Sequence, residues 1–264
     1  MQAIRTYVIN LDGSEARLAD IRRKLDAYGI AFERVAAVDG RTYDMDSLPD
    51  YDLAAAKRFM GRGLVGGEIG CYYSHLKAAK AFLQSDARHA LILEDDAEPL
   101  CNVIELLKAA LPDIDILDPD WLLLNIGNNR LKLSTTIDEY PVGGTNYELV
   151  AAHYFPMTTN AIVWSREGAR RFVAEHTTIF APVDNFFRYW LTREGHGYSF
   201  RPAPVTTTGA DSLILSDKGA RRQTGNRSWF YQLAKQKRLA EEKLLAWRKK
   251  RNFRLLRKPV PDDK

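Results

Sequence analysis

The pattern of apolar and polar positions predicts strands and helices that alternate along the chain. A β-rich run over 7–11 ends in the turn residues Asp12-Gly13-Ser14. Apolar residues then recur at helical spacing as far as Tyr28, Gly29 ends that helix, and a second strand follows over 32–38. A strand–helix–strand unit of this kind is the usual opening of a parallel sheet.

Later segments continue the alternation. A helix from Glu68 to Leu83 leads into the all-apolar strand 90–93, which is typical of a strand buried on both faces. The other predicted elements are a helix over 103–111, a strand over 121–126, a strand over 161–164, helices over 165–175 and 183–193, and paired short strands within 195–208. Between them, 130–145 is expected to be a long polar connection of the kind that often carries function.

These elements predict an α/β fold with a catalytic domain over 1–220 and a helical tail over 221–264. The composition agrees, since 45% of the 264 residues are hydrophobic and 27% are charged, as in ordinary globular proteins. It excludes collagen-like and disordered chains. The two cysteines, Cys71 and Cys101, are too few for a disulfide framework. Cys71 lies in an apolar, glycine-rich stretch and is expected to be a buried filler rather than a reactive thiol.

The net charge of +4 hides an uneven distribution. Residues 221–264 hold 15 Lys and Arg against 4 Asp and Glu, whereas the rest holds 23 against 30. In the tail, apolar residues recur at helical spacing among the basic ones: Trp229, Leu233, Ala240, Leu244 and Trp247. A basic helix of this type is typical of one that lies on an anionic membrane, here over 221–258. Two alternatives stay open: the helix packs on the acidic body, or it is a solvated end.

The compartment is predicted from what the sequence lacks. The N-terminus shows no apolar signal segment, and no apolar run is long enough to span a bilayer. The expected location is therefore the cytoplasm, peripherally on the inner face of the cytoplasmic membrane. No nucleic-acid-binding module is recognised, so no nucleic-acid partner is expected.

The sharpest chemical signal is a run of acids directly after the buried strand. Glu94, Asp95 and Asp96 would gather like charges at the carboxyl edge of the sheet, where α/β folds bind ligands. Such repulsion is relieved by a cation, and carboxylate oxygens suit Mg²⁺ or Mn²⁺, which commonly act on a diphosphate. The alternative is a helix N-terminus, which favours acids but explains Asp96 better than Glu94 and Asp95.

A second motif matches a dinucleotide-binding fingerprint but is not expected to bind a dinucleotide. Residues 61–66 match GxGxxG, but the dinucleotide fingerprint requires a preceding strand, and 53–59 has a helical pattern. A mobile glycine-rich loop that closes over a substrate is the preferred interpretation.

Taken together, the motifs resemble glycosyltransferase family 25, which includes bacterial lipooligosaccharide galactosyltransferases and the collagen galactosyltransferase domain. The resemblance covers residues 4 to about 215. Its motifs, in order, are Val8-Ile9-Asn10-Leu11 with Arg17 downstream, Ala37-Val38-Asp39-Gly40, Gly67 to His75, Leu93-Glu94-Asp95-Asp96, and Pro182-Val183-Asp184-Asn185-Phe186.

The resemblance implies a GT-A-type fold and an inverting transfer of galactose from UDP-galactose to a surface glycan of the lipooligosaccharide type, with Mn²⁺ or Mg²⁺. It implies that Asp96 is a metal ligand and that Glu94 reaches the metal or the donor ribose. Asp184 is the candidate base for the acceptor hydroxyl, although a plain helix N-cap explains it about as well. The collagen branch has a histidine where this chain has 205–209 without one, which leaves the third metal ligand open.

The remaining site predictions each have a structural alternative. Asn10, Arg17, Asp39, Ser74, His75 and Asp95 are candidate donor-binding residues. Asn10 and Asp39 are equally explained as turn residues, Arg17 as an exposed helical residue, and His75 as a packed histidine. Asn185, Phe186 and Tyr189 are candidate acceptor contacts, although aromatics at helical spacing usually belong to a core.

Two other functions stay open beside galactosyl transfer. One is the same chemistry with another UDP-hexose or a UDP-hexosamine as donor. The other is a non-catalytic, membrane-associated adaptor whose acids cap a helix.

Overall fold

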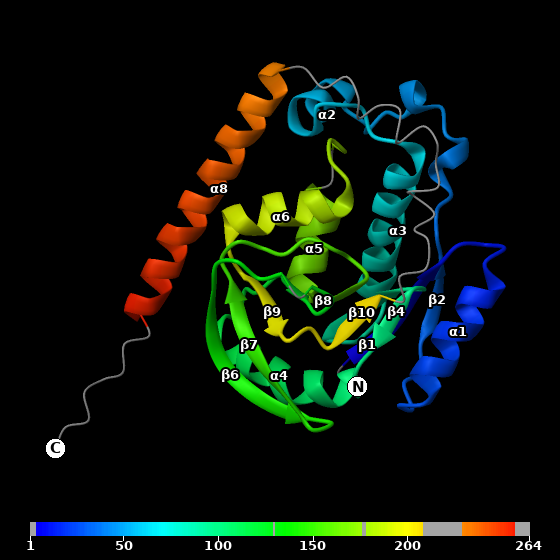
Figure 1. The fold of residues 1–264 in the computed structure, drawn as a ribbon. Coiled ribbons are helices and arrows are strands. Elements are labelled where there is room, and N and C mark those ends of the chain that lie inside the picture. The colour runs from blue at the N-terminus through cyan, green and yellow to red at the C-terminus, as the bar shows by residue number, and fades with distance from the viewer. Residues whose placement is uncertain (1–3, 129, 176–177, 208–228, 257–264) are drawn as a thin grey trace.

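An eight-stranded sheet forms the centre of the molecule, with the order β2-β1-β3-β8-β5-β9-β7-β6 (Figure 1). The computed structural model describes residues 4–128, 130–175, 178–207 and 229–256. The strands of this sheet are β1 (Ile4–Asn10), β2 (Glu33–Ala36), β3 (His89–Glu94), β5 (Leu123–Asn125), β6 (Ser134–Val142), β7 (Thr145–Ala152), β8 (Ala161–Ser165) and β9 (Gly197–Arg201).

The sheet is mixed, but most strands share one direction. Within the described residues, β7 and β8 run opposite to the other six strands. The parallel pairs β2–β1 and β1–β3 form the N-terminal half, as the strand–helix–strand pattern predicts. The expected mostly parallel sheet is thus confirmed in strand direction, although four of its seven adjacent pairs are antiparallel.

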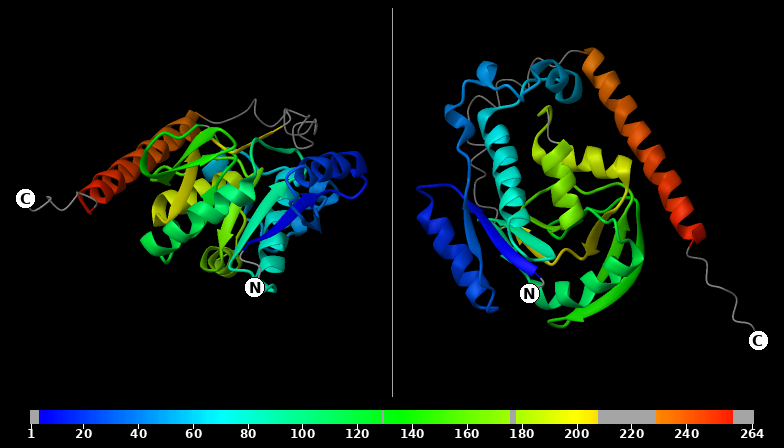
Figure 2. Two further views of the ribbon diagram at one scale, coloured as in Figure 1. Left: turned by 90° about the horizontal axis from the view of Figure 1, so that it is seen from below. Right: turned by 180° about the vertical axis from the view of Figure 1, so that it is seen from behind.

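Helices cover both faces of the sheet and complete an α/β layered fold (Figure 2). On one face, α1 (Glu15–Asp26) and α4 (Val103–Leu117) share a core with β1 and β3. On the other face lie α2 (Leu53–Met60), α3 (Gly66–Leu83), α5 (Arg166–Glu175) and α6 (Val183–Glu194). Trp164 at the centre of that second core is fully buried and stacks on Phe172.

Glycines allow α3 to approach the segment that follows β2. A Cβ on Gly66 would lie 2.1 Å from the carbonyl oxygen of Gly40, and one on Gly70 would lie 2.4 Å from that of Val38. A side chain at either position would therefore push the helix away. The spacing of glycines in this stretch fixes the N-terminal turns of α3 against η1 (Gly40–Thr42) and the strand end.

Two segments differ from the expectations. The predicted polar connection over 130–145 is wrong: most of it is β6, which forms a hairpin with β7 across Gly143 and Gly144, both with positive φ. The pairing expected within 195–208 is also wrong, because β9 joins the main sheet and β10 (Val205–Thr207) pairs with β4 (Ala97–Pro99). One face of this hairpin is polar, and its polar residues hide the alternation of apolar and polar positions that would identify β6 as a strand.

The C-terminal helix α8 (Trp229–Leu256) packs along α2, α6 and β6 (Figure 1). Its buried side chains include Glu242, which is 2% exposed and pairs with Arg193 at 3.2 Å, and Ala246. Packing on the body, one of the two alternatives for the tail, is therefore confirmed for α8. The predicted domain boundary at 220/221 lies outside the described residues. Among the helices described, none has the length and apolar content that crossing a membrane requires.

Candidate active site

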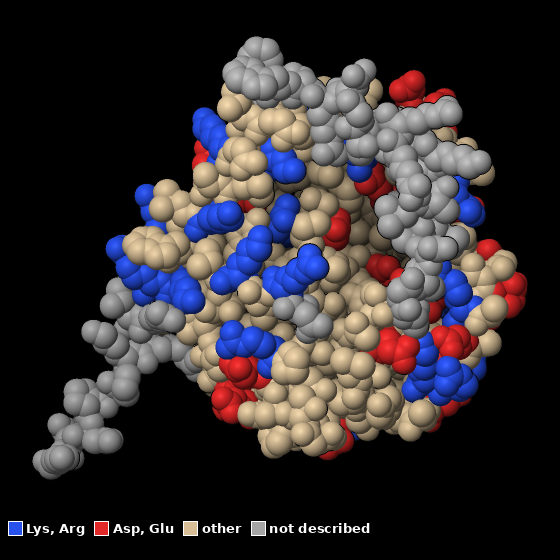
Figure 3. Space-filling view, in the orientation of Figure 1, with Lys and Arg blue, Asp and Glu red and all other residues tan. Residues whose placement is uncertain are grey.

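The candidate site lies where the parallel strands β1, β2 and β3 end. Because β8 is antiparallel to β3, its first residues meet the same edge: Leu93 pairs with Ala161, and the Glu94 amide donates to the carbonyl of Asn160. The segment before β8 thereby joins the acidic cluster, and α3 closes the other side. Figure 3 shows acidic side chains within a hollow on this face of the molecule.

Asp95 is held by two partners from the N-terminal unit. Arg17 on α1 lies 2.6 Å from its Oδ1, and the Asn10 amide at the end of β1 donates to its Oδ2 at 2.8 Å. Asp95 is only 9% exposed. Burial raises its pKa, against the opposing effects of Asn10 and Arg17.

The carboxylate of Asp96 has fewer close partners than that of Asp95. Its Oδ2 lies 3.6 Å from Arg17, and within the described residues its buried Oδ1 has no hydrogen-bond partner. Burial, followed by the negative charge of Glu94, raises the pKa of Asp96 to about 6. An acid in this condition favours a bound cation, because a cation replaces the lost solvation and cancels the repulsion.

Glu94 is oriented by two side chains, His75 and Thr159. Its Oε1 lies 3.1 Å from Nε2 of His75 and accepts a 2.7 Å hydrogen bond from the Thr159 hydroxyl. Burial raises the pKa of Glu94, but the interactions with His75 and Thr159 outweigh it and hold the pKa below its ordinary value. Glu94 therefore stays charged beside Asp96.

Asp184 lies in the first turn of α6 and faces the same acids. It follows the first residue of the helix, Val183, so it is not the N-cap, which is Pro182. Its Oδ1 accepts hydrogen bonds from the backbone and side-chain amides of Asn185, at 2.6 and 2.9 Å. Burial raises the pKa of Asp184 above the ordinary carboxyl value, and the charge of Glu94 adds to the rise.

Two adjoining pockets meet at the acids and share Cys71, Glu94 and Asp96. We name the two pockets after the roles predicted from the sequence for their residues. The first, the donor pocket, is bounded by α1, the turn after β2 and α3. Besides the shared residues, it is lined by Ile9, Leu11, Arg17, Ala37, Val38, Asp39, Gly40, Arg41, Gly67, Ser74, His75 and Asp95. The second, termed the acceptor pocket, includes Asp184, Asn185 and the segment before β8, 158–160. A group leaving one pocket and a nucleophile in the other would meet beside Glu94 and Asp96.

Several predicted site residues lie around the two pockets, but their polar groups are bonded to other groups of the protein. Asn10 is 1% exposed and lies behind Asp95. The Ser74 hydroxyl donates to the Gly70 carbonyl and accepts from the Val38 amide. Asp39 lines the donor pocket, but its carboxylate caps η1 and pairs with Arg41 at 2.6 Å.

The aromatic residues predicted to contact the acceptor do not line the acceptor pocket. Phe186 packs among the rings of Phe172 and Trp190 in the core. Tyr189 packs edge-on against Phe59 beneath α8, and Arg193 stacks on its ring. Of the predicted acceptor residues, only Asn185 lines that pocket. Side chains at helical spacing here face the core, which is the alternative that the spacing left open.

Sequence reasoning missed two parts of the cleft. Cys71 is half-buried and lines both pockets, so it is not simply a core filler. Burial, with nearby carboxylates, raises the pKa of its thiol well above the ordinary value, which agrees with the expectation that the thiol is not a reactive one. Thr158 adopts a φ of 85°, which is strained for a β-branched residue, in the segment that delivers Thr159 to Glu94. No sequence signal marks that strain.

The glycine-rich segment 61–66, expected to be a mobile loop, is held to its surroundings by side chains. Arg62 pairs with Glu68 at 2.5 Å, with both side chains largely buried, and the Leu64 amide donates to the Tyr51 hydroxyl. The helix α2 that precedes it confirms that the GxGxxG match does not follow a strand.

Comparison with known proteins identifies the family of the chain. The family described as glycosyltransferase family 25 (LPS biosynthesis protein) matches residues 3–187. Procollagen galactosyltransferase 1-B of Xenopus laevis is 29% identical over 232 residues, which cover 80% of this chain and 37% of that protein. The inactive glycosyltransferase 25 family member 3 of Mus musculus is 27% identical over 235 residues, covering 80% and 38%. This chain therefore spans little more than a third of the length of these relatives.

Among solved structures, a glycosyltransferase involved in the glycosylation of the major capsid of PBCV-1 aligns with a TM-score of 0.42 and 12% identity, covering 80% of this chain and 94% of that one. The family match extends over well more than half of the chain and includes the acidic cluster, α3 and the start of α6. The chain belongs to glycosyltransferase family 25, and its α/β fold has the mostly parallel central sheet that the resemblance to that family predicts.

Proposed function

We propose that this chain is an inverting, divalent-metal-dependent galactosyltransferase that transfers galactose from UDP-galactose to a hydroxyl of a bacterial lipooligosaccharide or related surface glycan. The observation that carries the proposal is the pair of pockets that meet at Glu94 and Asp96. One pocket holds the arginine and the strand-end turns that suit a nucleotide diphosphate. The other holds a carboxylate, Asp184, that suits the activation of a hydroxyl.

The residues present fit Mn²⁺ or Mg²⁺. Asp96 offers a buried carboxylate oxygen with no partner among the described residues, and Glu94 offers a charged carboxylate beside it. Such hard oxygen donors are the preferred ligands of these ions. When bound, the ion supplies positive charge that stabilises the departing diphosphate.

The roles of the other groups follow from their positions. Arg17 is the cationic side chain nearest the acids in the donor pocket and would bind a phosphate oxygen. His75 and Thr159 hold Glu94 in place. Asp184 accepts the proton of the acceptor hydroxyl, and its raised pKa makes it a stronger base than an ordinary carboxylate.

The acceptor and the membrane association belong to the same proposal. The basic helix α8 would bring the enzyme to lipid-linked acceptors at the cytoplasmic face of the membrane. Leu233, Leu244 and Trp247 support this, because they are about half exposed and lie on the solvent side of α8. Lys and Arg side chains gather over the part of the surface where α8 lies (Figure 3).

Release of UDP from UDP-galactose, in the presence of a surface-glycan acceptor, tests the function. We expect turnover with Mn²⁺, none in EDTA, and none in Asp96→Ala with the circular dichroism spectrum unchanged. Full activity of Asp96→Ala in EDTA would refute the proposal. Because family members described as inactive exist, turnover is the decisive measurement: binding of UDP without turnover of any UDP-sugar would indicate the adaptor. Faster turnover of another UDP-hexose or of a UDP-hexosamine would correct the donor only.

A further inference from the structure

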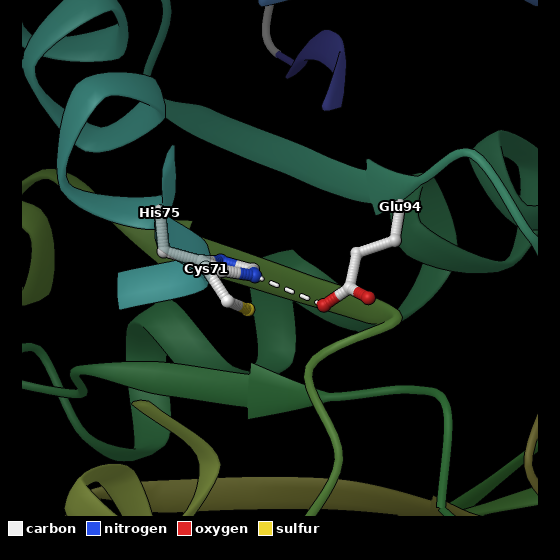
Figure 4. A group of neighbouring side chains, drawn as sticks. All are labelled: Cys71, His75 and Glu94. Carbon is white, nitrogen blue, oxygen red and sulfur yellow. Dashed lines mark hydrogen bonds and ion pairs between the residues drawn. The ribbon is translucent and has the colours of Figure 1, made fainter. Parts of the chain in front are cut away.

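Three side chains of metal-binding type converge at the border between the two pockets. Cys71 and His75 lie one helical turn apart on α3, and Glu94 reaches toward them from the end of β3 (Figure 4). The Cys71 sulfur, a His75 ring nitrogen and a Glu94 carboxylate oxygen all lie within 4.8 Å of one another. The spacing Cys-x-x-x-His places both α3 ligands on one face of the helix.

This ligand set differs chemically from the Asp96 site. Sulfur and imidazole prefer Zn²⁺ and Co²⁺, whereas Mg²⁺ and Mn²⁺ prefer oxygen. Three protein ligands with an open fourth position also form the usual arrangement at accessible zinc sites. Bond lengths of ~2.0–2.3 Å imply ligand atoms ~3.5 Å apart. The ligand atoms now lie within 4.8 Å of one another, so the most distant pair must approach by about 1 Å.

Burial of His75 supplies an independent observation. The ring is fully buried, and within the described part of the chain its Nδ1 has no hydrogen-bond partner. The other nitrogen, Nε2, faces Glu94 at 3.1 Å. A cation bound to Nε2 and Oε1 requires Nε2 without a hydrogen, which places the proton of the neutral ring on Nδ1. Binding then releases one proton to solvent, from the Cys71 thiol.

We propose that Cys71, His75 and Glu94 form a site for a thiophilic divalent cation of the Zn²⁺ type, separate from the site at Asp96. The two sites share Glu94, so a zinc ion held by Cys71 and His75 competes with the donor-binding ion. Zinc is thus an inhibitor of the Mn²⁺-dependent reaction rather than a substitute for manganese. The binding itself does not depend on the proposed transferase activity.

Cobalt titration of the purified full-length chain tests the site. Co²⁺ bound to a thiolate gives a ligand-to-metal charge-transfer band in the near ultraviolet, which oxygen-only sites lack. We expect this band to saturate at one Co²⁺ per chain and to disappear when Zn²⁺ is added. Excess Mg²⁺ should leave it in place.

The second cysteine provides the matched control. Cys101 is buried at the opposite core, so Cys101→Ser leaves Cys71 as the only thiol of the chain. We expect the band in Cys101→Ser and its loss in both Cys71→Ser and Cys71→Ala. Absence of the band from the wild type, or its persistence in a folded Cys71 variant, overturns the proposal. A failure to detect transferase activity would leave the cobalt result unaffected.

Discussion

The Arg17 guanidinium lies 2.6 Å from the Asp95 carboxylate and 3.6 Å from that of Asp96. The chain therefore supplies a cation of its own to an acidic cluster that is largely withdrawn from water. One arginine faces three consecutive acids, so the cluster keeps a net negative charge after this pairing. The same guanidinium lines the donor pocket, where a diphosphate would compete with the acids for it.

This double role predicts opposite effects of Arg17→Ala on two ligands. Without the arginine, the acids repel one another more strongly and Mn²⁺ alone should bind about tenfold more tightly. UDP should bind about tenfold more weakly, because a charge-assisted contact to phosphate is lost. Isothermal titration with each ligand measures both. Arg5→Ala, which removes an exposed pair with Glu33, is the control. Weaker binding of both ligands would contradict the double role.

Asp96 predicts an unusual dependence of stability on pH. Its folded-state pKa, about 6, lies above its ordinary value of 3.8, so the folded protein binds the proton more tightly than the unfolded chain does. The free energy of unfolding should therefore decrease as pH rises from about 4 to 6, and ionised Asp96 should destabilise the metal-free protein at pH 7.5.

Replacing Asp96 tests this directly. In EDTA at pH 7.5, Asp96→Asn should raise Tm by ~2–4 °C, and at pH 4.5 the difference should shrink as the wild type takes up the proton. Mn²⁺ should stabilise the wild type and not the variant. Differential scanning calorimetry measures all of these. A variant less stable than wild type at pH 7.5 in EDTA would show that the Asp96 charge is satisfied within the protein.

Asp184 predicts a loss of rate without a loss of donor binding. If it accepts the acceptor proton, Asp184→Asn should lower kcat by about 10²–10⁴, while UDP and Mn²⁺ still stabilise the protein against heat. The acidic limb of the wild-type pH–rate profile should lie above the ordinary carboxyl range, because burial raises the pKa of Asp184. Glu105→Gln, at an acid in the first turn of α4 outside both pockets, is the control and should leave kcat unchanged. An Asp184→Asn variant as fast as the wild type would refute the role of Asp184 as the base.

The sequence predicts most of the sheet and the acidic edge, because these depend on local patterns. The apolar strand β3 followed by three acids is readable from residues alone. By contrast, the cleft-facing position of Cys71 depends on the rotation of α3, and Thr159 reaches Glu94 only because β8 runs antiparallel to β3. Such relationships arise from tertiary packing between residues up to 65 positions apart, which periodicity does not contain.

The contact between α8 and the loop after α2 can be measured with a matched pair of glycines. Gly61 and Gly13 have φ values of 75° and 83°, so a substitution to Ala strains both backbones by a similar amount, about 1 kcal/mol. Only at Gly61 would the new Cβ meet another side chain, the ring of Tyr231, at 2.6 Å; at Gly13 nothing lies within 4 Å. Gly61→Ala should therefore lower the free energy of unfolding more than Gly13→Ala, and it should make α8 more accessible to limited proteolysis. Equal effects would mean that α8 does not pack there.

The outer face of α8 tests whether the helix docks on a membrane. With 100° per residue, Leu233, Leu244 and Trp247 fall within a sector of about 60°, and each is about half exposed. The opposite face, which includes Ala246 and Glu242, is buried on the body, so the outer stripe can enter an interface without unpacking the helix. Leu244→Glu combined with Trp247→Glu should lower binding to vesicles containing anionic lipid by at least about tenfold, since each side chain contributes ~1–2 kcal/mol on burial.

Sedimentation with vesicles of neutral and of mixed anionic composition measures this binding. Ile116→Glu, at an 81% exposed isoleucine on α4, adds one negative charge on another face, half of what the double substitution adds, and should leave binding unchanged. We expect raised salt to weaken binding of the wild type, because the basic residues that flank the stripe act through screened charges. Binding that survives the double substitution would place the membrane contact elsewhere on the chain. Binding that also fails with Ile116→Glu would mean that added negative charge alone, rather than loss of the apolar stripe, abolishes it.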